Sequence, residues 1–210
     1  MDWRAILRRV PTRSLTIVGD LAQSAARELP GTWADRLDPV LTTTWHLEEL
    51  TVSYRTPGSI TDAAMRVARR AGLSPSPLTS ARDVPEAFVV NRTDDLFAAG
   101  REHARAALDR GAHGADGRVA VIVAAERLDA AREAFAGLAV RDSRTGEPVL
   151  RIVTARQSKG LEFDVVVLVE PAEILAESAG NLYVAMTRPT RQLRVVHRDE
   201  LPAGFTDGDF

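Results

Sequence analysis

The residues of this chain that could carry chemistry gather in four short segments, each at a point where a strand or helix is expected to end. In the first, residues 18–23 (Val-Gly-Asp-Leu-Ala-Gln), a carboxylate at Asp20 and an amide at Gln23 follow an apolar run. An amide can accept a hydrogen bond from an attacking water and donate one to a phosphate oxygen. Gly-Asp is also common at strand-to-turn junctions, so a purely structural role stays open.

Two further segments place an arginine at the end of an element. Arg55 follows the strand-like run 50–54, and Arg188 ends a short helix predicted over 181–187, which Pro189 stops. A guanidinium held there can bind an anion or stabilise charge that develops on a transferred phosphoryl group. The alternatives are a surface arginine beside a turn for Arg55 and, for Arg188, complementation of the helix dipole, which is typically worth about 0.3–1 kcal/mol.

The fourth segment, residues 152–164 (Ile-Val-Thr-Ala-Arg-Gln-Ser-Lys-Gly-Leu-Glu-Phe-Asp), joins two apolar runs through polar residues. It contains Lys159, the one lysine among 27 basic residues. Against a background of arginine, a single lysine suggests a site that needs a compact ammonium, although it can also have survived by chance. Thr154, Arg156 and Lys159 could contact a polyanion backbone, and Glu162 could accept a hydrogen bond from a ribose hydroxyl.

Several site classes are excluded by what the sequence lacks. Lys159 is preceded by Ser158 and followed by Gly160, so the chain has no Gly-x-x-x-x-Gly-Lys-Ser/Thr phosphate loop. Residues 165–168 followed by Glu170 imitate a Walker B strand, but without a phosphate loop we interpret them as sheet core. The absence of cysteine excludes disulfides, thiolate metal sites and cysteine nucleophiles. Four scattered histidines give no reason to expect a metal site in this chain.

Composition places the chain among ordinary globular proteins, with 45% hydrophobic and 27% charged residues over a length of 210. A formal net charge of −2 gives no global basic field, so a surface that binds nucleic acid would have to be local. No apolar run reaches membrane-spanning length, and the N-terminus lacks a signal pattern. We therefore expect a cytoplasmic protein without a membrane partner.

The elements that must position these residues alternate between strands and helices. We predict strands over 15–18, 50–54, 88–90, 119–124, 150–155, 165–169 and 193–196, and helices over 3–10, 59–71, 93–110, 127–138 and 181–187. Residues 73–83, which contain Ser-Pro-Ser-Pro, are predicted to be a loop. Continuous Val/Ile runs are typical of parallel strands that are buried on both faces. The pattern predicts an α/β fold with a doubly wound, mostly parallel sheet, helices on both faces, and ligands at the carboxyl edge.

Taken in order, the four segments resemble motifs of the superfamily 1 helicases of the UvrD/Rep/PcrA type. GDLAQ is similar to motif III, SYR to motif IV, TARQSKGLEFD to motif V and LYVAMTR to motif VI. The resemblance spans residues 3–197, implies a RecA-like fold of the P-loop NTPase type, and is closest to the actinobacterial HelD-like branch. Some HelD-like proteins bind RNA polymerase and use ATP to free it from nucleic acid.

The resemblance implies a role for each matching residue. Gln23 would sense the γ-phosphate of ATP, and Arg55 and Arg188 would contact it, with Arg188 as the arginine finger. Glu162 would hold the ribose, with Gly160 and Asp20 also in the nucleotide site. Thr154, Arg156 and Lys159 would touch single-stranded nucleic acid; the family usually has histidine where this chain has Arg156, and a cation can still meet a phosphate.

The family's Walker A and Asp-Glu-Ala-Gln motifs lie upstream of motif III, and this chain begins after both. We therefore expect residues 1–47 to be the C-terminal edge of a first RecA-like domain and residues 48–210 to be the second. ATP with Mg²⁺ would bind only together with the N-terminal RecA-like domain of the parent chain, whose residues would hold the metal. The chain alone is expected not to hydrolyse ATP.

Two classes of function follow from the resemblance. The leading hypothesis is the C-terminal half of an ATP-dependent helicase or translocase that acts on single-stranded or duplex DNA. The alternative is a HelD-like module that binds RNA polymerase and remodels transcription complexes, or a docking domain that does not hydrolyse ATP. Intact Gln23, Arg55, Glu162 and Arg188 favour the motor, whereas near-neutral charge and 5% aromatic residues argue against strong autonomous DNA binding. The space between motifs IV and V is filled by the second domain, so duplex unwinding is less strongly implied than ATP hydrolysis.

Overall fold

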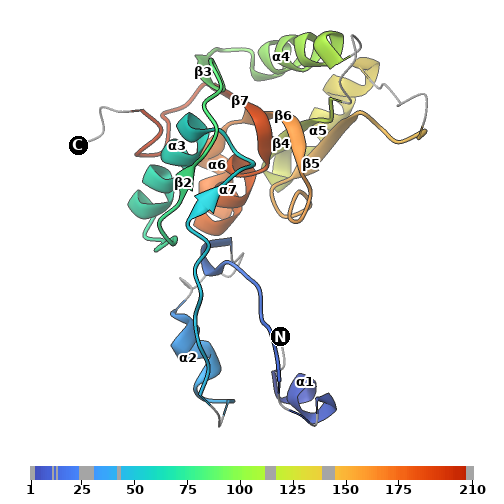
Figure 1. The fold of residues 1–210 in the computed structure, drawn as a ribbon. Helices are drawn as coiled ribbons and strands as arrows, with labels where there is room; N and C mark the ends of the chain where they lie inside the picture. Colours follow the sequence, from blue (N-terminus) through green and yellow to red (C-terminus); the bar gives the residue numbers. More distant parts are fainter. Residues whose placement is uncertain are drawn as a thin grey trace.

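The computed structural model describes residues 3–10, 12, 14–23, 31–41, 44–111, 117–138 and 145–206. Figure 1 shows an α/β domain from which the N-terminal part of the chain projects. That N-terminal part contains α1 (Trp3–Arg9), the 3-10 turn η1 (Leu21–Gln23) and α2 (Trp33–Leu37). The remaining elements belong to the α/β domain, which contains the sheet and the core.

The centre of the domain is a five-stranded sheet in the order β3-β7-β6-β4-β5, with every neighbouring pair parallel. Its strands are β3 (Phe88–Arg92), β4 (Val119–Val123), β5 (Leu150–Thr154), β6 (Phe163–Val169) and β7 (Pro189–His197). β4 is buried at all five residues, because it has a strand on either side and helices on both faces. These five strands confirm the corresponding sequence predictions to within a few residues at each end.

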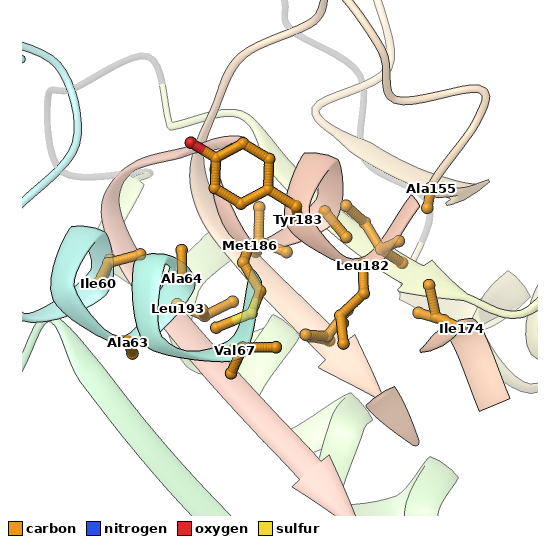
Figure 2. Packing of buried hydrophobic residues seen from close by; sticks show 14 of the residues in the cluster. Ile60, Ala63, Ala64, Val67, Ala155, Ile174, Leu182, Tyr183, Met186 and Leu193 are labelled. Carbon is orange, nitrogen blue, oxygen red and sulfur yellow. The ribbon is translucent and has the colours of Figure 1, made fainter. Parts of the chain in front are cut away.

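Helices cover both faces of this sheet, which confirms the doubly wound α/β class. One face carries α3 (Gly58–Arg70), α6 (Pro171–Glu177) and α7 (Ala179–Met186); the other carries α4 (Leu96–Gly111) and α5 (Leu128–Phe135), with the 3-10 turns η2 (Ala125–Arg127) and η3 (Ala136–Leu138). Side chains along β4 alternate between the two cores, since Ile122 packs with the first set and Val121 with the second. Figure 2 shows the first core, where Ile60 and Val67 of α3 lie near Met186 of α7.

The helix α3 follows directly from its local sequence. Apolar residues at Ile60, Ala63, Ala64 and Val67 recur at helical spacing and are buried against the sheet. The helix ends in a Schellman motif, in which Gly72 has φ +81, its N–H donates to the carbonyl of residue 69, and the next N–H donates to the carbonyl of residue 68. Only glycine adopts this left-handed conformation without strain, which explains why the predicted helix ends there.

Three sequence predictions differ from the structure. The run 15–18 is extended but forms no strand among the described residues, and its Val18 is 90% exposed, because no strand of the described chain lies beside it. The run 50–54 contributes only β1 (Val52–Ser53), which pairs in parallel with β2 (Thr79–Ser80) inside a segment predicted to be a loop. α6 was not predicted, although Pro171 at its first turn is a recognised start signal.

Candidate functional site

The charged residues singled out by the sequence meet at the amino ends of two neighbouring strands. Glu162 immediately precedes β6, and Arg188 immediately precedes β7. These strands are adjacent, and the N–H of Phe163 donates to the carbonyl of Arg188 at 3.2 Å. The prediction that the site lies at the carboxyl edge of the sheet is therefore wrong. That rule describes ligands held by loops that follow strands, whereas these two residues lie on segments that lead into strands.

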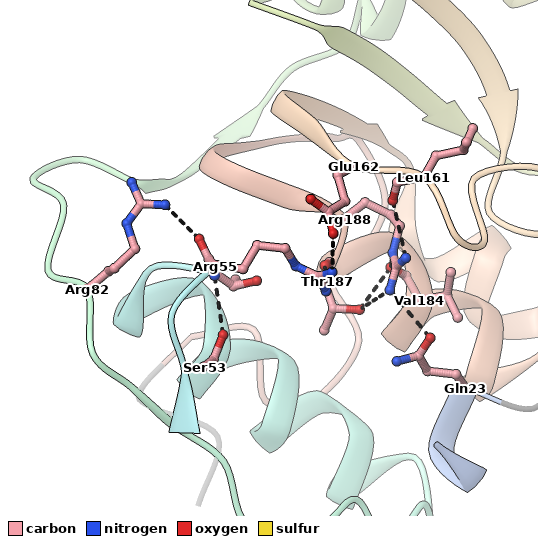
Figure 3. A network of polar contacts seen from close by, with 10 residues as sticks. Gln23, Ser53, Arg55, Arg82, Leu161, Glu162, Val184, Thr187 and Arg188 are labelled. Atoms are coloured by element: carbon pink, nitrogen blue, oxygen red, sulfur yellow. Dashed lines mark hydrogen bonds and ion pairs between the residues drawn. The ribbon is translucent and has the colours of Figure 1, made fainter. Parts of the chain in front are cut away.

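Arg55 lies just beyond β1 and reaches this edge with its side chain (Figure 3). Its Nη1 donates to Oε1 of Glu162 at 2.7 Å, and its Nη2 donates to the carbonyl oxygen of Thr187 at 3.3 Å. Both side chains of the ion pair are more than a third exposed, so the pair adds at most about 1 kcal/mol to stability. Arg55 Nε is buried and has no hydrogen-bond partner among the described residues. The carboxylate expected to hold a ribose is thus engaged by an arginine through one of its two oxygens.

Arg188 is the most buried cation of the site, with 4% of its surface exposed. Its guanidinium donates to neutral oxygens only: the carbonyls of Val184 at 3.0 Å and Leu161 at 3.2 Å, Oγ1 of Thr187 at 3.3 Å, and Oε1 of Gln23 at 3.4 Å. Burial, followed by the nearby positive charge of Arg55, lowers the pKa of Arg188 below its ordinary value. No carboxylate lies within ion-pair distance of it in the described part of the chain.

These contacts address the two interpretations of Arg188. The bond to the Val184 carbonyl closes the last turn of α7, so the helix-capping role expected of a cation at that position is present. The Nη groups point away from the helix, toward Leu161 and Gln23. A buried guanidinium with neutral partners is also a favourable neighbour for an incoming anion, because low local polarity strengthens their attraction.

The Gly-Asp-Leu-Ala-Gln segment packs against this arginine. Asp20 accepts hydrogen bonds from the N–H of Ala22 and from Nε2 of Gln23, both at 2.9 Å, so its carboxylate closes the η1 turn. The same bond orients the Gln23 amide, whose oxygen faces Arg188. Asp20 therefore has the turn-forming role that its sequence context allowed, and it holds Gln23 in position.

The residues expected to contact nucleic acid lie at the end of β5 (Thr154) and on the loop that leads from it to β6 (Arg156 and Lys159), in three different environments. Thr154 is buried, and it exchanges two hydrogen bonds with Gln157, of 3.0 and 3.2 Å, that close the loop. Lys159 donates from Nζ to the carbonyl oxygen of Gln23 at 3.0 Å, and Arg156 is exposed. Gly160 has φ +79 with open space where a side chain would lie, so it is required by the turn.

A cavity of about 80 Å³ lies beside Arg55, between η1, β1, α3 and α7. It is large enough for two or three water molecules. Tyr183 borders it, with its hydroxyl 3.9 Å from the sulfur of Met65, and burial raises the pKa of this phenol to about 12. The polar residues that line the cavity are Asp20, Gln23, Ser53, Arg55, Thr56, Thr61, Tyr183 and Thr187.

Sequence reasoning missed the residues that hold the Arg55 loop. Arg82 donates from Nη1 to the carbonyls of Arg55 and Thr190, both at 2.8 Å, and Ser80 donates to the carbonyl of Thr56 at 2.6 Å. Arg82 comes from the segment 73–83, which was predicted to be a loop without chemistry. Its partners are 27 and 108 residues away, and no local sequence signal could have paired them.

Neither a metal cluster nor a membrane-spanning helix occurs in the described part of the chain. Within the ranges that the structure describes, no group of three or more histidine, aspartate or glutamate side chains could hold a metal ion. Among those same residues, no helix combines the length and apolar character needed to cross a membrane.

Comparison with known proteins supports a likeness to helicase domains. Residues 150–196 match the sequence model of the family described as UvrD-like helicase C-terminal domain, a range that contains Glu162 and Arg188. The fold is similar to the crystal structure of the C-terminal domain of a possible DNA helicase from Lactobacillus plantarum WCFS1, with a TM-score of 0.50 and 19% identity over 73% of this chain and 92% of that chain. That likeness agrees with the expected RecA-like fold. No curated protein matches.

Proposed function

We propose that this chain is the C-terminal half of an ATP-dependent DNA translocase or helicase. The observation that carries the proposal is the convergence of Gln23, Arg55 and Arg188, from three distant segments, around a buried guanidinium that has no carboxylate partner in the described residues. Residues 1–47 would complete a first RecA-like domain that carries the phosphate loop, and residues 48–210 would be the second. ATP would bind between the two.

In this proposal each arginine meets the γ-phosphate from the side of the second domain. Arg188 acts as the arginine finger, because a guanidinium fixed in a buried site stabilises charge that develops on the transferred phosphoryl group. Arg55 supplies a second cation. Its pairing with Glu162 leaves the other carboxylate oxygen for a ribose hydroxyl. Mg²⁺ would arrive with ATP and be held by residues of the first domain.

The contact between Lys159 and Gln23 offers a physical route from nucleotide to nucleic acid. Lys159 bonds the backbone of Gln23, whose side chain faces Arg188. A change at the γ-phosphate that moves Gln23 would therefore also move the loop of Lys159 and exposed Arg156. We place part of a single-strand track on this loop; with a net charge of −2, binding would be local and weak in this chain alone.

A second candidate function rests on exposed apolar side chains. Among the residues that the structure describes, the large hydrophobic side chains that are exposed lie on the N-terminal arm, the described part of residues 3–50, and at its junction with the domain: Val18, Leu47, Leu50, Val52 and Tyr54. Exposed apolar patches commonly mark protein contacts. Under the leading proposal the partner is the first RecA-like domain; under the alternative it is RNA polymerase, bound by a HelD-like or non-hydrolysing module.

ATP turnover tests the proposal directly. We expect none from the chain alone and clear activity after addition of a separate polypeptide that carries the family's Walker A and Asp-Glu-Ala-Gln motifs. Appreciable turnover by the chain alone would contradict it. A bound but inactive mixture would favour the docking alternative. Salt dependence also distinguishes the motor from the docking module. The affinity of a nucleic-acid motor for its substrate falls steeply between low and moderate salt, whereas the affinity of a docking module for its protein partner falls much less.

A further inference from the structure

Arg82 lies half-buried between the two segments that carry the site's arginines. Its Nη1 donates to the carbonyl of Arg55 and to the carbonyl of Thr190, two residues after Arg188, with both bonds at 2.8 Å. Figure 3 shows the first of these bonds. A single nitrogen of one cation thus holds the backbone on both sides of the site.

Further hydrogen bonds from residues 80–82 hold the Arg55 loop, residues 54–58, in place. The carbonyl of Arg82 accepts from the N–H of Gly58 at 2.9 Å, and the hydroxyl of Ser80 donates to the carbonyl of Thr56 at 2.6 Å. The N–H of Arg82 in turn donates to the Ser80 hydroxyl at 3.0 Å. Residues 80–82 therefore bond three backbone groups of this loop: the carbonyls of Arg55 and Thr56 and the N–H of Gly58.

The direct contacts between the two arginine-bearing segments are weak by comparison. Arg55 reaches the Arg188 segment through a long bond of 3.3 Å to the carbonyl of Thr187. Its ion pair is with Glu162 on a third segment, residues 152–164, and is exposed. The positive charge of Arg55 also disfavours the charged form of Arg188, so the two guanidinium groups repel each other. Something other than their side chains must keep them close.

We propose that Arg82 is a positioning residue that fixes the separation of Arg55 and Arg188 by its bonds to the carbonyls of Arg55 and Thr190. In this role it acts through the backbone of the two arginine-bearing segments and not on the nucleotide itself. The consequence of this positioning is that both arginines reach one γ-phosphate, and that consequence rests on the proposed function. We call the two bonds of Arg82, to the carbonyls of Arg55 and Thr190, the Arg82 clamp. The clamp lies within this chain, so its effect on the two arginines can be tested without ATP.

The first test observes the two arginines in the chain alone. NMR of ¹⁵N-arginine-labelled protein follows the Nε–H signals of Arg55 and Arg188, assigned by single arginine-to-lysine variants. We expect Arg82→Ala to shift or broaden both signals. The matched control is Arg66→Ala, because Arg66 bonds the carbonyl of Gly204 outside the site. Arg82→Lys should restore both signals in large part. In the wild type a single nitrogen, Nη1, donates both bonds, and the ammonium of a lysine can likewise donate to two carbonyls.

The proposal is overturned if Arg82→Ala leaves both signals unchanged or if Arg66→Ala moves them equally. If Arg82→Ala no longer unfolds cooperatively, Arg82→Gln takes its place, since its amide is too short to reach both carbonyls. Arg82→Lys then remains the rescue in the same comparison.

The second test uses ATP turnover in the reconstituted mixture. Arg82→Ala should lower kcat about tenfold or more, because misplacement by about an ångström is costly, and should change KM less than about threefold. Arg66→Ala should leave kcat unchanged. Unchanged kcat in Arg82→Ala overturns the positioning role. A mixture that is inactive with the wild-type chain overturns the proposed function instead, while the NMR comparison still decides the clamp.

Discussion

At the scale of single residues, the site depends on Arg188, a buried cation surrounded by neutral oxygens. Burial of a charge without a counter-charge is costly, and the four acceptors reduce that cost without removing the positive field. Nη2 of Arg188 faces the side chain of Gln23. Removal of the guanidinium should therefore affect a reaction that develops negative charge there more than it affects the binding of ATP.

Arg188→Ala in the reconstituted protein should lower turnover on the order of 10³-fold and change ATP affinity far less. The reason is that the cation stabilises charge that exists mainly in the transition state. Steady-state turnover together with equilibrium nucleotide binding measures both effects. A loss of turnover of less than about tenfold would contradict the assignment of Arg188 as the arginine finger.

Tyr183 gives a prediction about pH at the same scale. In the folded chain burial raises its pKa to about 12, whereas in the unfolded chain it ionises near its ordinary value of about 10. The folded state therefore holds the proton that the unfolded state loses, and stability should fall by about 2–3 kcal/mol as pH rises from 10 to 12. Urea unfolding of Tyr183→Phe should show a shallower fall. Tyr54→Phe, at the exposed second tyrosine, is the control and should match the wild type.

At the scale of elements, the C-terminal segment packs onto α3. Phe205 is 1% exposed and its ring lies 6.4 Å from that of Phe88, between centroids. Gly204 allows this approach, because it has φ +95 and an added Cβ would lie 2.9 Å from backbone atoms of Arg66 and Val67. Close contact and backbone conformation both require glycine here.

Gly204→Ala should therefore lower the free energy of unfolding by about 2–4 kcal/mol, since strain and overpacking act together. Gly146→Ala is the matched control: it has φ +71 but nothing within 4 Å of an added Cβ, so only the backbone strain of about 1 kcal/mol applies. Urea unfolding at neutral pH compares them. Equal losses in the two variants would show that the contact with α3 adds nothing.

At the scale of the whole molecule, the N-terminal arm differs from the domain it leaves (Figure 1). The arm exposes apolar side chains, among them Val18 at 90% and Leu50 at 87%, while the domain buries both faces of its sheet. The arm also places Gln23 against Arg188, which joins it to the site. A partner that covers the arm would therefore lie next to the arginines.

Val18→Asp and Leu50→Asp should weaken binding of the Walker A-bearing polypeptide at least tenfold, because a charge would be buried in the contact. The stability of the chain alone should stay within about 0.5 kcal/mol, since both positions are exposed. Ala98→Asp is the control, because Ala98 is exposed on α4, on the face of the sheet opposite to η1 and α7. Titration calorimetry measures the affinities, and unchanged binding in both arm variants would exclude the arm as the contact.

The sequence by itself determined the α/β class and the five parallel strands, and it singled out the segments that form the candidate site. These features are local, because apolar runs mark strands, helical spacing marks the buried face of α3, and Gly72 marks its end. The same local signals failed for residues 15–18, where β-type composition is present but no neighbouring strand exists in the described chain. Strand propensity does not specify a partner.

The tertiary structure alone decided how the site is assembled. It placed Glu162 and Arg188 at the amino ends of β6 and β7. It also paired Arg55 with Glu162 across 107 residues. Finally, it brought Arg82 between the carbonyls of Arg55 and Thr190, which are far apart in the sequence. Strand order fixes which loops become neighbours, and that order results from long-range packing of both faces of the sheet. Residue types could therefore suggest the chemistry, but only the fold could show which groups share one edge.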